Sequence, residues 1–228
     1  MATHLKENSS IEVVADMVDA TAAALESDPE TAELAETWRA MTVKADAMAA
    51  ERRALDRAVR RARARLNVSD GMWDTTVAAF GRAVVDASGG HRDQPPYSRF
   101  FAKTAPHKTQ TFGTAREIDL GRAWLVELAR NPDEPLSKTW TPKLKDATDT
   151  LASAFEERDA GVKAIGPQQT AVVLFIDDVN RELDRLDGEL RKLFAGSTER
   201  VASFLAATRP SRRYHKDDTD QTPDIPAE

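Results

Sequence analysis

The stretch LAETWRAMTVKADAMAAERRALDRAVRRARARL, residues 34–66, decides the fold. Its side chains repeat at alternating spacings of four and three residues. The positions that keep this spacing are Leu34, Trp38, Met41, Ala45, Met48, Arg52, Leu55, Val59, Ala62 and Leu66. A 3.5-residue period held over several heptads is typical of helices packed as in a coiled coil. We therefore expect one helix from near Glu30 to Leu66, about 55 Å long.

The composition of the chain favours an all-α protein with a substantial core. Of its 228 residues, 41% are hydrophobic, 31% are charged and only 6% are aromatic. Ala, Leu, Arg, Glu and Asp are abundant, and this mixture is typical of long helices. The sequence has no Cys, which excludes disulfides, thiol nucleophiles and thiolate metal sites. The net charge of −6 argues against a surface covered by positive potential.

A second stretch repeats the pattern further along the chain. LSKTW at residues 136–140 lies 102 positions after LAETW at residues 34–38, and other landmarks keep a distance of 102 to 104 positions. These landmarks are Asp28-Pro29 with Asn131-Pro132, Val59 with Val162, Ala62 with Ile165, and FFAKTAP (100–106) with FLAATRP (204–210). The repeat predicts an elongated antiparallel helical bundle built from two tandem, sequence-related multi-helix units. Short turns between successive helices favour antiparallel neighbours.

Four segments follow from this repeat. Residues 10–107 form the first helical unit, and residues 108–210 form the second, related unit. Residues 1–9 are expected to be a flexible N-terminus. Residues 211–228 have no apolar periodicity, which predicts a disordered C-terminal tail.

Local signals predict where helices start and stop. Ser9 with Glu12, and Thr114 with Glu117, have the spacing of capping boxes at helix starts. Asp28-Pro29 predicts a cap followed by the first residue of a helix. Turns are expected at residues 67–71 and at Gly166-Pro167, because glycine and proline interrupt helices there.

The sequence offers little for catalysis or for metal binding. A di-iron site in a helical bundle needs a His three residues after a Glu, and no such pair occurs. The phosphate-binding loops, the dinucleotide turn and the Gly-x-Ser-x-Gly elbow are also absent. We expect no enzyme, no catalytic residues, no metal and no cofactor, and we identify no small-molecule substrate. The longest apolar run, AVVLFI at residues 171–176, is too short to span a bilayer, and a cytoplasmic location is the expectation.

One segment is strongly basic. Residues 51–66 carry seven Arg against two acidic residues, a charge of +5, whereas residues 1–50 carry ten acidic against three basic residues, a charge of −7. The seam places four of these Arg side chains on the outer face of the helix: Arg53, Arg57, Arg60 and Arg61. They are candidates for binding an acidic partner surface or nucleic-acid phosphates. Alternatively, they pair with the acidic first helix and with the acidic start of their own helix. The sequence favours this pairing, because the acidic segment is adjacent and the second repeat has no matching Arg cluster.

Two further features allow two interpretations each. Basic residues flank the aromatic residues Tyr97, Phe100, Phe101 and Phe112, a pattern that suits stacking on single-stranded nucleic acid or an apolar end of the bundle. The flanking bases are Arg92, Arg99, Lys103 and Lys108. The leucine seam at residues 183–193 is expected to be buried within the chain, or to form a dimer surface if it is left uncovered.

These observations favour a non-catalytic scaffold, adaptor or assembly protein that binds another protein, or itself, through its helical faces. The alternative is a nucleic-acid-associated protein that docks through the Arg-rich face.

Overall fold

The computed structural model describes residues 3–102, 104–109 and 111–209, and these residues form helices with no strand. The all-α prediction is confirmed. The predicted tail at residues 211–228 lies outside the described residues. The elements in chain order are α1 (Ile11–Glu26), the short 3₁₀ helix η1 (Pro29–Thr31), α2 (Ala32–Ala87), α3 (Tyr97–Phe101), α4 (Pro106–Thr109), α5 (Thr114–Ala129), α6 (Pro135–Leu193) and α7 (Thr198–Ala207).

Helix α2 is longer than the sequence predicted. It continues without interruption through residues 67–71, so the turn expected there is wrong. The buried side chains of Leu66, Trp73 and Val77 lie before and after this segment and pack into one core. A glycine in a helix costs only about 1 kcal/mol relative to alanine, and packing on both sides outweighs that cost. The seam prediction itself agrees with burial, because every one of its residues is buried or half-buried.

Helix α6 also continues through a predicted turn, the one at Gly166-Pro167. Proline removes one backbone donor from the helix interior, which weakens a helix without always ending it. Packing holds the next residue, Gln168, in place. Its side chain is buried, and the side-chain nitrogen Nε2 donates to the Met48 carbonyl at 3.3 Å. The following turn places Val172 in the core, so tertiary contacts maintain the helix.

The helix starts differ from the predictions by one residue. Ser10, not Ser9, is the N-cap of α1, and its hydroxyl accepts from the Val13 amide at 3.4 Å. The N-cap of α5 is Gly113, so the predicted capping box of Thr114 and Glu117 is wrong. The prediction for Asp28 is confirmed, since its carboxylate accepts from the Glu30 amide at 3.0 Å with Pro29 beginning η1.

The chain divides into two compact units, which differ from the two predicted sequence units. Unit 1 contains residues 1–54 and 165–228, and unit 2 contains residues 55–164. Each long helix therefore contributes one part to each unit. The prediction that residues 10–107 and 108–210 are related sequences is a separate matter, and it stays a prediction.

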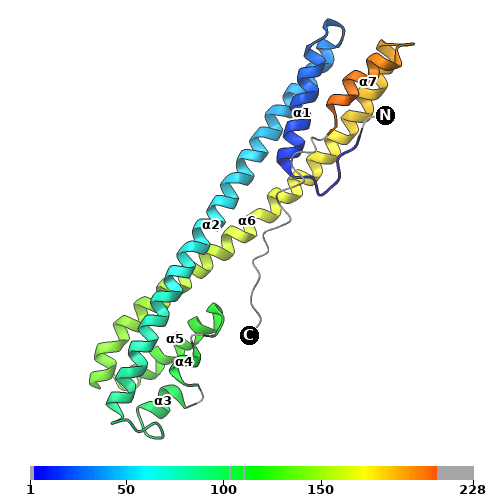
Figure 1. The fold of residues 1–228 in the computed structure, drawn as a ribbon. Helices are drawn as coiled ribbons and strands as arrows, with labels where there is room; N and C mark the ends of the chain where they lie inside the picture. The colour runs from blue at the N-terminus through cyan, green and yellow to red at the C-terminus, as the bar shows by residue number, and fades with distance from the viewer. Residues whose placement is uncertain (1–2, 103, 110, 210–228) are drawn as a thin grey trace. The chain divides into compact units, whose positions relative to one another are not determined.

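Unit 1 contains α1 and α7, which pack against each other beside parts of α2 and α6 (Figure 1). Its core includes Val14, Trp38 and Ile176, each at most 2% exposed. The N-terminal segment is attached to this core. Leu5 is buried, its amide donates to Asn180 Oδ1 at 2.8 Å, and Asn180 Nδ2 donates to the Leu5 carbonyl at 3.1 Å.

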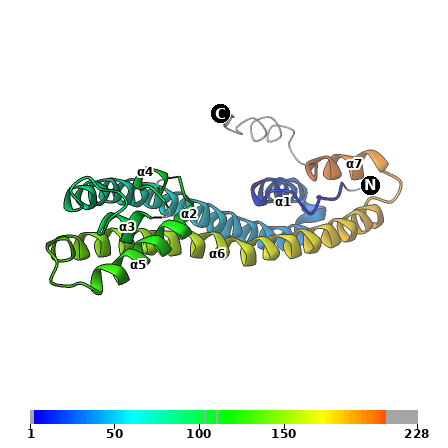
Figure 2. The same ribbon diagram turned by 90° about the horizontal axis from the view of Figure 1, so that it is seen from below.

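Unit 2 has an aromatic core, formed where α3 and α5 pack beside the long helices (Figure 2). Phe80 is fully buried, with ring centroids 5.1 to 5.8 Å from four other aromatic rings. The rings of Trp73 and Trp124 stack with centroids 6.2 Å apart. The indole nitrogen of Trp124 donates to the Phe100 carbonyl at 3.2 Å, which ties α5 to α3.

Candidate functional site

The four predicted Arg residues all lie on α2, and all four are exposed. Arg53 belongs to unit 1, whereas Arg57, Arg60 and Arg61 belong to unit 2. Residues four positions apart share one face of a helix, so Arg57 and Arg61 point to the same side, with Arg60 beside them. Arg57, Arg60 and Arg61 therefore form one surface within unit 2.

The ion pair at the end of α1 bears on the alternative pairing with the acidic first helix. Glu26, at the end of α1, forms an ion pair with Arg39 rather than with the Arg-rich segment. Within the described part of the chain, neither Arg60 nor Arg61 has an ion-pair partner. These two guanidinium groups therefore remain available on the surface of unit 2.

The second basic region is not a stacking platform. Tyr97, Phe100 and Phe101 are at most 8% exposed and belong to the core of unit 2, which agrees with the interpretation as an apolar end of the bundle. The nearby Arg99 pairs with Glu134 at 2.7 Å, and Arg116 lies over the Phe112 ring at 3.8 Å. Lys103 lies outside the described residues.

Arg92, from the same region, lines a cavity of about 440 Å³ in unit 2. Arg82 and His107 line the same cavity, together with Asp86 and Tyr97. All three basic side chains are exposed, and the Arg92 guanidinium lies 5.9 Å from the centre of the Tyr97 ring. Asp86 and Tyr97 line the cavity beside Arg82 and Arg92, so the cavity has mixed polarity.

The leucine seam of α6 is buried, as expected. Leu183, Leu186 and Leu190 are at most 3% exposed and belong to the core of unit 1, whereas Leu193 is 44% exposed. The seam is therefore covered by the chain itself up to Leu190, and it offers no continuous surface for a dimer.

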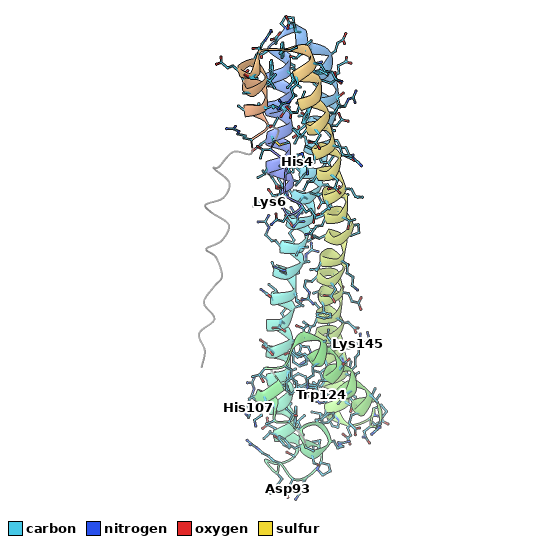
Figure 3. The ribbon with its side chains drawn as sticks, turned by 90° about the vertical axis from the view of Figure 1, so that its right-hand side faces the viewer. His4, Lys6, Asp93, His107, Trp124 and Lys145 are labelled. Atoms are coloured by element: carbon cyan, nitrogen blue, oxygen red, sulfur yellow. The ribbon has the colours of Figure 1, made fainter. Side chains whose placement is uncertain are left out.

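A different apolar surface lies in unit 2, in a groove of about 790 Å³ between α2 and α6. The short helices lie on one side of this helix pair (Figures 1 and 3), and the groove leaves Val68 and Met72 of α2 exposed at 65% and 55%. The α6 wall contains mostly small side chains. The lining residues are Ala64, Arg65, Val68, Ser69, Met72, Asp149, Thr150, Ser153, Ala154 and Glu157.

This groove continues directly into the Arg-rich face. Arg57, Arg61, Ala64, Val68 and Met72 follow one another at spacings of four and three residues, which places them on one side of α2. An ion pair crosses one end of the groove, where Arg65 Nη1 and Glu157 Oε1 lie 2.5 Å apart. The sequence contained a signal for the groove, in two large apolar residues outside the seam. The turn predicted at residues 67–71 hid that signal.

Sequence reasoning also missed a cluster of three carboxyl groups in unit 2, of which Glu117 is buried and Asp70 and Asp74 are half-buried. Glu117 of α5 is 2% exposed and hydrogen-bonds to Asp70 of α2, with Asp74 one turn further along α2. Burial raises the pKa of Glu117 to about 8, and the hydrogen bond to Asp70 and the nearby negative charges act in the same direction. Burial and the charge of Asp70 also raise the pKa of Asp74.

Several polar atoms around Glu117 are buried. Its Oε2 atom, the Trp73 indole nitrogen and the Thr148 hydroxyl are buried without a hydrogen-bond partner in the described residues. Glu117 lines neither the groove nor the cavity beside Arg92. Across the described residues, no three His, Asp or Glu side chains are arranged to hold a metal ion. The cluster is therefore a proton-binding contact between α5 and α2.

No protein-family model, curated protein or solved structure matches the chain. None of the described helices contains an apolar segment long enough to cross a membrane.

Proposed function

We propose that the chain is a non-catalytic helical scaffold, adaptor or assembly protein that binds a protein partner through a helical face. The groove between α2 and α6 in unit 2 carries this proposal. Val68 and Met72 expose most of their apolar surface there, and adjacent exposed apolar residues on a soluble helix are typical of an interaction site. Small side chains on the α6 wall leave room for a helix to approach closely.

Photo-crosslinking in cells tests the proposal on the full chain. A benzoylphenylalanine placed at Met72 of α2 is expected to form a protein adduct on irradiation, because the groove is covered in the complex. The matched control is Val126 of α5, which is also in unit 2 and is 60% exposed. No adduct at Met72, or equal adducts at both positions, contradicts the proposal.

The alternative function is nucleic-acid association through Arg60 and Arg61. Its support is that both are exposed and that neither has an ion pair within the described residues. Binding to phosphates releases counterions and therefore weakens steeply with salt. Retention on DNA that collapses between low and moderate salt, and that Arg60→Glu with Arg61→Glu abolishes, favours the alternative. Salt-independent flow-through of the unmodified chain excludes it.

We further propose that the fold is an antiparallel bundle that arose by tandem duplication. Two observations support this proposal. Helices α1 and α5 both have 16 residues and start 103 positions apart, and α2 and α6 also start 103 positions apart. In addition, α1 packs against α7 and α3 packs against α5, so the first helix of each copy contacts the closing helix of the other.

The proposal also includes coiled-coil-like packing of the long helices and a cytoplasmic location. The burial of the seam residues in α2 supports the packing. The lack of Cys is compatible with the location, which fractionation of cells that express the tagged chain tests directly.

A further inference from the structure

We propose that the partner in the groove is a second copy of this chain, docked in the opposite direction about a two-fold axis at Val68. This inference rests on the proposed function, since it names the occupant of the same groove. Two observations support it: the order of charges along the groove and the order of side-chain sizes. All the residues concerned belong to unit 2.

The two walls of the groove can be aligned from contacts within unit 2. Arg65 pairs with Glu157, and Gly161 packs against Val59, so residue numbers fall on α6 as they rise on α2. Val68 is therefore level with Ser153 on the opposite wall. Arg61 lies seven residues before Val68, and Asp146 lies seven residues before Ser153. Because the walls run in opposite directions, these two charges lie on opposite sides of that level, each about 10 Å away.

A two-fold axis at this level exchanges the two ends of the groove. It brings Arg61 of one copy to the level of Asp146 of the other, and the same contact occurs twice in a symmetric dimer. Both residues are exposed, and neither has an ion-pair partner within the described residues. Asp149, one turn from Asp146, pairs with Lys145. Figure 3 labels Lys145 on α6. Lys143 lies outside Asp146 and is held 4.9 Å from the centre of the Trp140 ring.

Side-chain sizes along α2 have the same symmetry. Ala64 lies four residues before Val68, and Met72 lies four residues after it. The axis therefore sets the large Met72 side chain of one copy against the small Ala64 side chain of the other, with Val68 meeting its own counterpart. Large side chains opposite small ones allow two helices to interdigitate.

The distribution of charge favours a second copy over other occupants. A uniformly acidic partner helix fits Arg57 and Arg61 but meets Asp146 with like charge at the other end. Nucleic acid has the same difficulty, because phosphates are negative along their whole length. A face that carries Arg57 and Arg61 toward one end and Asp146 toward the other is complementary to itself only when it docks in the opposite direction.

Sedimentation velocity of the full chain tests the charge pattern. We expect a dimer at micromolar concentration, and we expect Arg61→Glu or Asp146→Arg alone to raise the dissociation constant by roughly tenfold or more, since each change places like charges at both symmetric contacts. The double variant Arg61→Glu with Asp146→Arg restores the dimer, because it reverses both charges. Arg122→Glu, an exposed residue of α5, is the matched control and leaves association unchanged.

A cysteine at the axis gives an independent readout, since the chain has no Cys of its own. Val68→Cys is expected to form a disulfide-linked dimer on mild oxidation, whereas Val126→Cys is not. A monomeric wild-type chain, or a dimer indifferent to both charge changes, overturns the inference. If the chain is monomeric while Met72 still crosslinks to a different protein, the proposed function stands without this inference. If no adduct forms at all, both fail.

Discussion

The buried carboxyl group of Glu117 is expected to make the free energy of unfolding depend on pH. Its side chain is 2% exposed between α5 and α2, and its pKa is raised from the usual 4.5 to about 8 by burial, by the hydrogen bond to Asp70 and by nearby negative charge. At neutral pH the folded chain therefore holds a proton on Glu117 that the unfolded chain releases. Replacement by glutamine keeps the shape and a donor toward Asp70 while removing the titration.

The sign and the size of the effect follow from this difference. Because the unfolded carboxyl loses its proton near pH 4.5 and the folded one near pH 8, the free energy of unfolding falls as pH rises through that window. Each pH unit well inside the window removes about 1.4 kcal/mol, so the loss between pH 5 and pH 7.5 is about 3 kcal/mol. The raised pKa of Asp74 adds a loss of the same sign.

Urea denaturation followed by tryptophan fluorescence measures the effect, because Trp124 of α5 stacks on Trp73 of α2 in the same unit. We expect the wild-type chain to lose stability from pH 5 to pH 7.5, and Glu117→Gln to show a much flatter profile. At pH 7.5 the variant should be the more stable protein. Asp119→Asn, an exposed residue of the same helix, serves as the control. Identical slopes for the wild type and Glu117→Gln would refute the reasoning.

Three further predictions concern packing and helix formation, each measured by chemical denaturation. Gly71→Ala should stabilise the chain by about 1 kcal/mol, because α2 is helical there and an added methyl group meets no atom within 4 Å; a loss of stability contradicts the continuous helix. Gly121→Ala should destabilise by about 1–3 kcal/mol, because its methyl group lies 2.4 Å from the Thr148 hydroxyl, and Thr148→Ala in the same chain should recover most of that loss. Asn180→Ala should cost about 1–3 kcal/mol by removing both hydrogen bonds to Leu5, and faster amide exchange at Leu5 should accompany it.

The helical class could be predicted because a helix buries one side, so its apolar residues repeat at helical spacing. This spacing can be read from the sequence without knowing which other elements the helix contacts. The seam of α2 is buried or half-buried, and the leucine seam of α6 is buried up to Leu190, as that pattern indicates. The breaks were harder to predict. Gly71 and Pro167 each disfavour a helix locally, but a penalty of about 1 to 3 kcal/mol is smaller than the packing on either side of each residue.

The groove and the carboxyl cluster around Glu117 were not predicted from the sequence, for two reasons. Glu117 matched the spacing of a capping box with Thr114, yet the helix begins after Gly113, so the carboxyl group turns inward instead of capping. A shift of one residue thus separates an exposed cap from a buried, protonated group. The groove was missed for a different reason, because the turn predicted at residues 67–71 hid the apolar residues Val68 and Met72, which lie outside the seam of a continuous α2.

If the chain arose by the proposed duplication, the residues around Glu117 can be compared with their counterparts in the first copy. The position 103 residues before Glu117 is Val14, which is fully buried in the core of unit 1. The positions 103 residues before Gly121 and Thr148 are Val18 and Ala45, also fully buried there. In one unit the first helix is thus held by apolar contacts, which do not titrate. In the other, a small glycine faces a larger threonine, and a carboxyl group needs its proton. Only the second arrangement makes the packing of a first helix depend on pH, and it occurs in the unit whose other face carries the groove.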